Sequence, residues 1–387
     1  MTGLGPLSID IYLPAFPAIA RDLETDAAAV QLTLASYFAG FALMQLFAGA
    51  LADRFGRRPV LLKGTIVFVL GSVLCAVAPS IEWLIAARFF QAGGGAVAPV
   101  VARAVIRDLY SGRDAGRVLG YLASAMAVAP LLAPVVGGYL ELWFGWQATF
   151  HALTFTGLFL YVWARITYRE TLAEPVADAL NPKPLLRYSA MLLSNRIFLG
   201  YTLCMGFGFS LLFSWISSAP HVLMEQFGVQ SQNFGYVFAF AVVGYGVGAY
   251  VGARMVSRWG IALAVLWGIL LSTAAAVSLA LFGLIAEPRL AVTIFCVMFA
   301  LFGTAMLVPP AMAGAMTPFP GIAGIASALI GVVQMTFAIA ANVLSSWVYD
   351  GTDRPMVILM LMSALAAGVA FVVMLRTELR PEAPSNM

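Results

Sequence analysis

Long apolar runs dominate this chain and limit what it can fold into. They recur along all 387 residues, and short connections between them hold most of the charged side chains. A membrane-spanning helix needs about 20 mostly apolar residues. In hydrocarbon every backbone N–H and C=O must be paired within the protein, which only helices or a closed barrel achieve. A barrel would show short segments of alternating polarity, so the uninterrupted runs predict an all-α polytopic membrane protein.

Composition supports this fold class, because 62% of the residues are hydrophobic and only 10% are charged. A soluble domain carries about 25% charged residues. We expect twelve transmembrane helices, at approximately 1–20, 29–51, 62–80, 82–103, 117–140, 147–167, 196–219, 233–254, 261–284, 290–313, 322–347 and 355–376.

The basic residues indicate the orientation of these spans. One side of the predicted membrane holds 17 of the 21 Lys and Arg residues, and the other holds Arg21, Arg289 and Arg354. By the positive-inside rule the basic side is cytoplasmic, which places both termini in the cytoplasm. These scattered residues form no basic stripe of the kind that binds nucleic acid.

The chain divides in the middle. Residues 168–195 form the longest polar connection and predict a cytoplasmic linker between two six-helix halves, 1–167 and 196–387. A weak repeat supports pseudo-symmetry, because Arg54-Phe-Gly56 follows the second span and Arg258-Trp-Gly260 follows the eighth. In folds built from two parallel repeats, the substrate site lies near the midplane at the repeat interface.

Two charged residues lie well inside the predicted spans. Away from the span ends, Asp10 is the only acid and Arg88 the only base. A charged side chain at the centre of a membrane helix raises the free energy of insertion by ~2.5–3.5 kcal/mol, so such a residue normally has a partner or a function. Asp10 lies 11 residues before Arg21, which is a depth of roughly 16 Å. We expect the two to interact in a proton-coupling site; an inert buried ion pair is the structural alternative.

The position of Asp10 also raises a question about the first span. Only nine residues precede Asp10, about ten fewer than a 30 Å hydrocarbon core requires. We therefore expect a truncated first helix and a chain that starts late. A cleaved signal peptide explains this segment poorly, because a basic leading region and a small-residue cleavage site are both missing.

Two further segments carry chemistry. The connection after the second span reads GALADRFGRRP at 49–59, and we expect it to form a conformational latch or simply a basic topology-fixing loop. Its glycines permit close approach and a tight turn, and we expect Asp53 to pair with Arg103. The latch residues are Gly49, Asp53, Arg54, Gly56, Arg57, Arg58 and Arg103.

The fifth span combines two prolines with a glycine pair. Pro130 and Pro134 remove helix hydrogen bonds, and Gly137 and Gly138 let a neighbouring helix approach closely. This pattern predicts a tightly packed helix that seals one end of a cavity and bends during exchange. Ordinary small-residue packing is the alternative.

These segments resemble known signatures. The 49–58 loop is similar to the Gly-x-x-x-Asp-Arg-x-Gly-Arg-Arg signature of the major facilitator superfamily. The fifth span resembles the antiporter signature of its drug exporters, with Ala133 in place of the usual glycine. Together with the segments around Asp10 and Arg88, they resemble the bicyclomycin-resistance branch of the drug:proton antiporters, which also contains phenicol exporters.

The resemblance implies a major facilitator fold and efflux of small, mostly neutral or cationic drugs, driven by proton entry. It assigns Asp10 and Arg88 to the coupling machinery and suggests a monomer in membrane lipid. The expected partners are small-molecule drugs and protons. Polar or large residues within the spans are candidate drug contacts, although each also fits plain helix packing: Tyr12, Gln91, Met126, Phe207, Trp215, Gln334 and Asn342.

Two rival functions remain. A proton-coupled uptake symporter for a small nutrient would have the same fold, although the fifth-span signature argues against it. An enzyme is disfavoured, because the sequence contains neither a phosphate-binding loop nor a metal-ligand spacing nor a nucleophile–His–acid set. We therefore expect no cofactor and no metal, and a transport cycle driven by the proton gradient.

Overall fold

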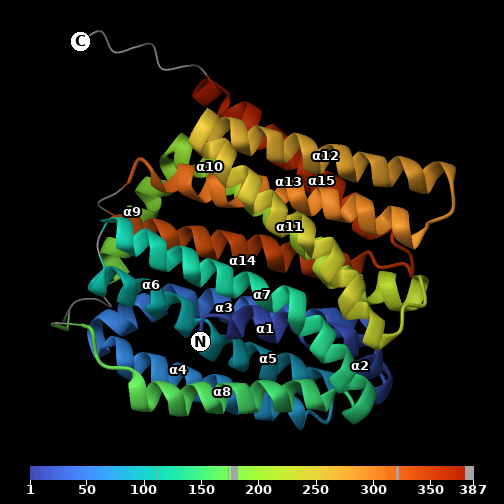
Figure 1. The fold of residues 1–387 in the computed structure, drawn as a ribbon, viewed down its shortest axis with the longest axis horizontal. Coiled ribbons are helices and arrows are strands. Elements are labelled where there is room, and N and C mark those ends of the chain that lie inside the picture. Colours follow the sequence, from blue (N-terminus) through green and yellow to red (C-terminus); the bar gives the residue numbers. More distant parts are fainter. Residues whose placement is uncertain (111, 173, 176–181, 320–321, 380–387) are drawn as a thin grey trace. The chain divides into compact units, whose positions relative to one another are not determined.

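The computed structural model describes residues 1–110, 112–172, 174–175, 182–319 and 322–379, with only the backbone described for residues 119–127 and a few other helical positions. Within these residues the secondary structure is helical throughout (Figure 1). Nine helical stretches in the described part of the chain are long and apolar enough to cross a membrane. The predicted all-α membrane fold is confirmed.

The helices follow the predicted spans closely. The first part of the chain forms α1 (Leu4–Asp10), η1 (Leu13–Ala15), α2 (Phe16–Asp22), α3 (Ala27–Phe55), α4 (Arg57–Ala76), α5 (Ile81–Gly95), α6 (Val97–Leu109), α7 (Gly112–Phe144) and α8 (Gln147–Thr167). The second part forms α9 (Pro182–Ser194), α10 (Arg196–Pro220), the π-helix η2 (His221–Gln226), α11 (Ser231–Trp259), α12 (Ile261–Ile285), α13 (Leu290–Met316), α14 (Ala323–Trp347), α15 (Arg354–Met374) and η4 (Arg376–Leu379).

The first predicted span is not one helix. It is broken between Asp10 and Phe16 into α1, a 3-10 turn and α2. Pro14 and Pro17 explain the break, because neither has an N–H to bond the carbonyl four residues earlier. Asp10 is the last residue of α1, so the break places it at an interruption of the helix. The fourth predicted span is also divided, into α5 and α6 at Ala96.

Glycines set how closely the helices pack. A Cβ added at Gly94 of α5 would lie 2.2 Å from the backbone nitrogen of Phe68 in α4. One added at Gly40 of α3 would lie 2.2 Å from the carbonyl oxygen of Phe89 in α5. Small residues at these contacts let α3, α4 and α5 approach closely, as in other membrane bundles.

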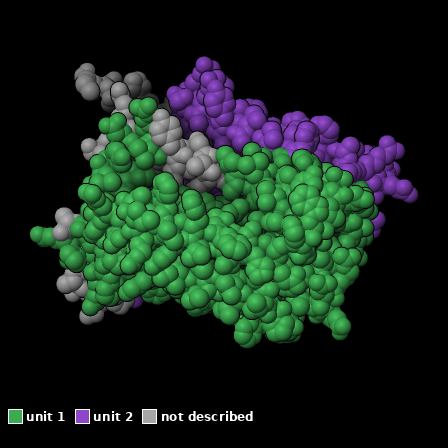
Figure 2. Space-filling model, turned by 60° about the horizontal axis from the view of Figure 1, so that its bottom comes forward, with its two compact units in different colours: residues 1–182, 217–239, 342–352 green, residues 183–216, 240–341, 353–387 purple. Residues whose placement is uncertain are grey.

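The described residues form two compact units (Figure 2). Unit 1 consists of residues 1–182, 217–239 and 342–352, and unit 2 consists of 183–216, 240–341 and 353–387. Unit 1 therefore contains α1–α8 together with one end each of the α10–η2, α11 and α14 segments. A buried cluster of unit 2 joins side chains of α9, α10, α12, α13, α14 and α15. The division into halves at 168–195 stays a prediction.

Candidate functional site

The Asp10 carboxyl group is buried at the break in the first span. The residue is 3% exposed. In the part of the chain that the structure describes, its carboxylate takes part in no hydrogen bond or ion pair. The backbone after it turns through η1, where the Ala15 N–H bonds the Tyr12 carbonyl at 2.9 Å. The site thus presents a secluded carboxyl group without a fixed ionic partner.

Arg88 lies in an aromatic cage. Its side chain is fully buried, and its guanidinium carbon lies 4.2 Å from the ring centres of both Tyr12 and Tyr37. Phe150 adds a third ring at 5.8 Å. Nη1 donates a hydrogen bond of 2.6 Å to Gln91 Oε1. Ring faces attract a cation strongly where water is excluded, so these rings and the amide hold the guanidinium without a carboxylate.

The expected contact between Asp10 and Arg88 is therefore wrong. No guanidinium nitrogen of Arg88 lies within 4.0 Å of an Asp10 carboxylate oxygen, and the ion pairs among the described residues involve other partners. The physical reason is that the tyrosines and Gln91 occupy the space around the guanidinium. Gln91, predicted as a drug contact, lies three residues after Arg88 on the same helix face, which is why its side chain reaches the guanidinium.

A chain of polar contacts extends from this cage. Gln91 Nε2 donates to Ser72 Oγ on α4 at 2.8 Å, and the Tyr12 hydroxyl lies 3.0 Å from Thr33 Oγ1 on α3. Tyr37 and Ser8 hydroxyls lie 2.6 Å apart. Ser8 precedes Asp10 by two residues on α1. The cage is thereby tied to the helix that carries the carboxyl group.

The predicted antiporter motif packs directly on the break next to Asp10. A Cβ added at Gly137 of α7 would lie 1.7 Å from the Ile11 carbonyl oxygen. One added at Gly138 would lie 2.2 Å from the Ser231 carbonyl oxygen of α11. The close approach predicted for these glycines is confirmed. Pro130 and Pro134 lie inside α7, which nevertheless continues from Gly112 to Phe144.

Unit 1 contains further contacts between helices that are distant in sequence. Gly235 of α11 packs against α7, since an added Cβ would lie 2.3 Å from the Val135 nitrogen. Ser346 Oγ of α14 donates to the Ala28 carbonyl of α3 at 2.9 Å. These segments lie at the membrane end that carries Arg21, where the first, second, fifth, eighth and eleventh predicted spans meet.

A histidine cluster lies at the same end. The His221 ring is buried, with Nδ1 3.0 Å from Glu225 Oε1 and its centre 5.0 Å from that of Tyr349. Tyr349 donates to Glu225 Oε2 at 2.9 Å. Burial, together with the hydrogen bond to Glu225 and its charge, raises the pKa of Tyr349 above its ordinary value. Phe16 lies 6.1 Å from the His221 ring, between ring centres.

The predicted drug contacts lie in different surroundings. Tyr12 and Gln91 belong to the Arg88 cage. In unit 2, Phe207 stacks edge-on against Phe337 at 4.8 Å, and Gln334 Nε2 lies 3.2 Å from Met205 Sδ. Trp215 is fully buried. The side chain of Met126 lies outside the described residues.

Among the predicted drug contacts, Asn342 differs in that its polar atoms are unpaired within the described part of the chain. It is fully buried in unit 1, and neither its Oδ1 nor its Nδ2 has a hydrogen-bond partner among the described residues. Gln31 of α3 is buried and unpaired in the same way. Gln31 follows Ala28 by three residues, and Asn342 precedes Ser346 by four. Since Ser346 contacts Ala28, both amides lie about one helical turn from that contact.

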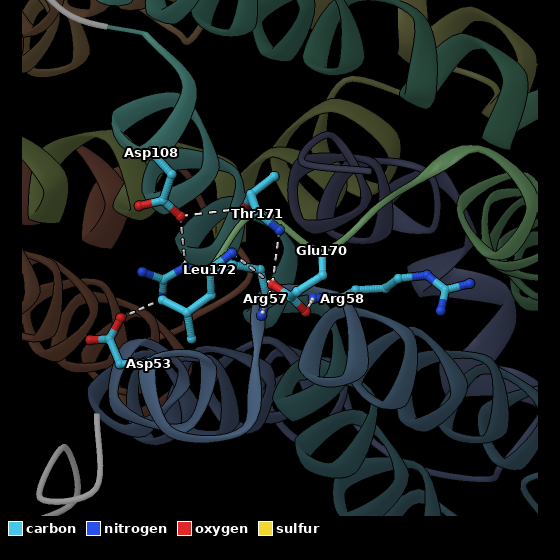
Figure 3. A network of polar contacts seen from close by, with 7 residues as sticks. All are labelled: Asp53, Arg57, Arg58, Asp108, Glu170, Thr171 and Leu172. Carbon is cyan, nitrogen blue, oxygen red and sulfur yellow. Dashed lines mark hydrogen bonds and ion pairs between the residues drawn. The ribbon is translucent and has the colours of Figure 1, made fainter. Parts of the chain in front are cut away.

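The latch residues form an ionic network (Figure 3). Asp53 pairs with Arg57 across the turn at Gly56, and Arg57 Nε donates to Asp108 Oδ2 of α6 at 3.1 Å. Gly56 has φ +97°, so the predicted tight turn is confirmed. Thr171 Oγ1 lies 3.4 Å from the same Asp108 oxygen. The network links the α3–α4 turn to α6 and to the segment after α8.

Glu170 caps the amino end of α4. Its Oε1 accepts from the Arg57 N–H at 2.9 Å and its Oε2 from the Arg58 N–H at 3.0 Å. The N–H groups of Thr171 and Leu172 also donate to Oε1, at 3.0 Å each. Partial burial opposes ionisation, but these four donors outweigh it and lower the pKa of Glu170. A carboxylate here also meets the positive end of the helix dipole.

Other latch expectations need correction. Arg103 does not pair with Asp53, because Arg57 reaches that carboxylate from the adjacent turn. Gly49 is not at a close approach, since a Cβ there would meet Val100 Cγ1 at an ordinary 3.8 Å. Arg54 lies over the Phe55 ring at 5.5 Å, and Arg58 Nη2 donates to the Arg165 carbonyl at 2.8 Å.

Sequence reasoning missed several members of these sites. Asp108 and Glu170 are acids on the strongly basic side of the membrane, and that contrast was a usable signal. Tyr37, Phe150 and Ser72 carried no such signal, because aromatic and hydroxyl residues are frequent in all the spans. Their roles depend on which helix faces meet around Arg88.

Known proteins resemble this chain along most of its length. The model of the Major Facilitator Superfamily matches residues 1–342. The multidrug resistance protein MdtL of Escherichia coli strain K12 is 32% identical over 335 residues, which cover 86% of this chain and 83% of that protein. An uncharacterized MFS-type transporter of Bacillus subtilis strain 168, YdgK, is 31% identical over 378 residues, which cover 95% of this chain and 92% of that protein.

Solved structures share the fold at lower identity. A D-xylose-proton symporter matches with a TM-score of 0.76 and 16% identity, covering 98% of both chains. A bacterial homologue of the human lysosomal transporter Spinster matches with a TM-score of 0.75 and 18% identity, covering 99% of this chain and 97% of that one. Both confirm the predicted major facilitator fold.

Proposed function

The chain belongs to the Major Facilitator Superfamily, and we propose that it is a multidrug exporter driven by proton entry. Its relatives identify it as an integral membrane transporter and not an enzyme. The observation that carries the proposal is the secluded Asp10 carboxyl group, which lies at a helix break packed against Gly137 of the antiporter-like motif.

The drug class follows from two observations. A relative that covers most of the chain is named a multidrug resistance protein. The segments around Asp10, Arg88 and Pro130–Gly138 resemble the bicyclomycin-resistance branch. We therefore assign the chain to that branch and its cargo to small hydrophobic or amphipathic drugs.

Proton coupling centres on Asp10. A carboxyl group without a fixed ionic partner changes its protonation as its surroundings change. In the proposed cycle, Asp10 takes up a proton when the site faces outward and releases it when a drug binds from the cytoplasm. Arg88 keeps a positive charge nearby and, held by its cage, positions Tyr12 two residues after Asp10.

The proposed drug contacts include buried side chains whose hydrogen-bond donors and acceptors are unpaired among the described residues. Asn342 offers an acceptor and two donors that no described residue engages. Gln31 offers the same set one turn beyond the Ala28–Ser346 contact. Phe207 and Trp215 supply aromatic surface, which adapts to varied apolar cargo. The protein works as a monomer in the inner membrane, with both termini in the cytoplasm.

The latch controls the cytoplasmic end of the path. Arg57 contacts two acids from different helices, so movement of α6 relative to the α3–α4 turn breaks one of the two ion pairs. Arg57 itself is buried, but the Asp53 and Asp108 carboxylates are partly exposed, so water screens both ion pairs in part. A network of modest strength suits a contact that must open in each cycle.

Expression in a host that lacks its own exporters tests the function. We expect cells that express the wild-type protein to tolerate at least about fourfold higher concentrations of several chemically unrelated drugs. Vector alone is the control. Lack of protection against every drug, combined with proton-dependent uptake of a labelled nutrient, would contradict export and support the symporter alternative.

A further inference from the structure

Unit 2 has an apolar groove on its surface. The groove has a volume of about 600 Å³ and is formed by α11 and α12, with α13 behind them. One side consists of Val251, Met255 and Trp259 on α11, and the other of Leu263, Trp267 and Leu271 on α12. Each set is spaced by four residues, so each lies along one face of its helix.

The length of the groove matches one leaflet of a bilayer. It begins at the turn between Trp259 and Ile261 and extends to Leu271, ten residues into α12. At 1.5 Å per residue this is about 15 Å, half of a hydrocarbon core of roughly 30 Å. Trp259 is 59% exposed and lies at the end where tryptophans favour the membrane interface.

Two arginines border the groove. Arg254 and Arg258 each precede a groove residue by one position on α11, so they form an adjacent stripe. Both are exposed, and neither takes part in an ion pair among the residues that the structure describes. The Arg254 guanidinium lies 4.4 Å from the Tyr250 ring centre.

Arg254 lies at the end of the eighth predicted span, five residues before Trp259 and about 7 Å along the helix from the end of the groove. An exposed guanidinium at the membrane boundary attracts an anionic head group. A phosphate suits the planar fork of an arginine, which donates two hydrogen bonds at once.

We propose that this groove binds an anionic phospholipid from the leaflet that borders the α11–α12 turn. One acyl chain lies along the groove between Met255 and Trp267. The lipid phosphate lies against Arg254 and Arg258, and Trp259 covers the glycerol region. The site holds its lipid whether or not the chain exports drugs.

Native mass spectrometry of the full-length protein tests this site. The protein is purified in detergent and titrated with phosphatidylglycerol or with phosphatidylcholine of the same chains. We expect wild type to retain phosphatidylglycerol about tenfold more strongly than phosphatidylcholine, because two basic side chains lie near the anionic head group. The paired substitution Arg254→Gln with Arg258→Gln should remove that preference.

Two further variants complete the experiment. Arg289→Gln removes an exposed arginine just before α13, in the connection at the opposite end of α12 from the α11–α12 turn. We expect this variant to keep the preference for phosphatidylglycerol. Leu271→Trp fills the groove, leaves both arginines in place, and should weaken retention of both lipids. Equal retention of the two lipids by wild type would overturn the proposal. So would an unchanged preference in the paired variant, or, if that variant does not fold, unchanged retention in Leu271→Trp.

Discussion

Asp10 and Arg88 are held by the protein in different ways. The guanidinium is enclosed by Tyr12 and Tyr37 and bonded to Gln91, so its position is fixed. The Asp10 carboxyl group has no comparable set of partners among the described residues. The arrangement differs from an inert ion pair, because the guanidinium and the carboxylate do not neutralise one another.

Shortening Arg88 tests the cage. Arg88→Lys keeps the charge, but an ammonium cannot contact two ring faces and the Gln91 oxygen in the same geometry. We expect a loss of unfolding free energy of about 1–2 kcal/mol, the scale of a desolvated cation–π contact. Thermal unfolding in detergent measures it, with Arg289→Lys on an exposed connection as the control. Equal stability of the two variants would argue against a tight cage.

At the scale of helices, glycines decide which elements meet. Gly137 places α7 against the break after Asp10, and Gly138 and Gly235 bring α7 and α11 together. Each lies where an added methyl group would overlap backbone atoms, which are much harder to displace than the end of a side chain. The antiporter-like motif is therefore a packing surface at the helix break that follows Asp10.

Gly137→Ala tests this surface. Its methyl group would lie 1.7 Å from the Ile11 carbonyl oxygen, so α7 must move away from the break. Overpacking of this kind typically costs about 1–3 kcal/mol, and we expect export to fall at least about tenfold. Gly246→Ala on α11 is the matched control, since an added Cβ there meets nothing within 4 Å. Full export by Gly137→Ala would show that the close contact is dispensable.

The Glu170 cap predicts a dependence on pH. Because its pKa is lowered in the folded protein, its stabilisation is complete above the ordinary carboxyl value of about 4.3. It is lost as pH falls through the lower folded value. We expect Glu170→Gln to lower the unfolding temperature at pH 7, by the equivalent of about 0.5–1 kcal/mol for an exposed cap.

The same comparison at low pH is the check on that prediction. The gap between wild type and Glu170→Gln should narrow as both are moved from pH 7 toward pH 3. Glu174→Gln, an exposed acid four residues away, should behave like wild type throughout. A gap that stayed constant with pH would mean that Glu170 acts through shape and not through its charge.

Sequence predicted the helices well and the contacts between them less well. Span length is set by bilayer thickness, which is why 147–167 and 261–284 match α8 and α12 almost to the residue. Gly56 and Gly137 were identifiable because backbone geometry permits few other residues there. The partners of Arg88 and Asp53 could not be identified from the sequence, because they depend on the rotation of each helix about its axis. Neighbouring residues also compete for these charged groups, as Tyr37 does for Arg88 and Arg57 does for Asp53.

At the scale of the whole molecule, alternating access requires contacts that form and break. The Ala28–Ser346 contact and the His221–Glu225–Tyr349 cluster join segments far apart in sequence within unit 1. In the proposed cycle these contacts separate when the site faces outward. Locking one of them should therefore stop the cycle without removing any group that binds a drug.

A cross-link between positions 28 and 346 tests that requirement. Cysteines placed at Ala28 and Ser346, joined by a short thiol-cleavable reagent, should reduce export to the background level. Cleavage of the reagent should restore it. Each single-cysteine variant is a control for modification alone. The native Cys75 and Cys204 are buried, and the partly exposed Cys296 is replaced by Ser in every variant. Undiminished export by the cross-linked protein would mean that this contact does not open.

The central claim is that Asp10 carries the proton that drives export. Purified protein in vesicles with an internal pH dye measures proton movement when drug is added under an imposed pH gradient. Wild type and Glu287→Gln, an exposed loop substitution, should move protons with the drug, whereas Asp10→Asn should bind drug but move no protons. Drug-dependent proton movement by Asp10→Asn at the wild-type rate would contradict the account.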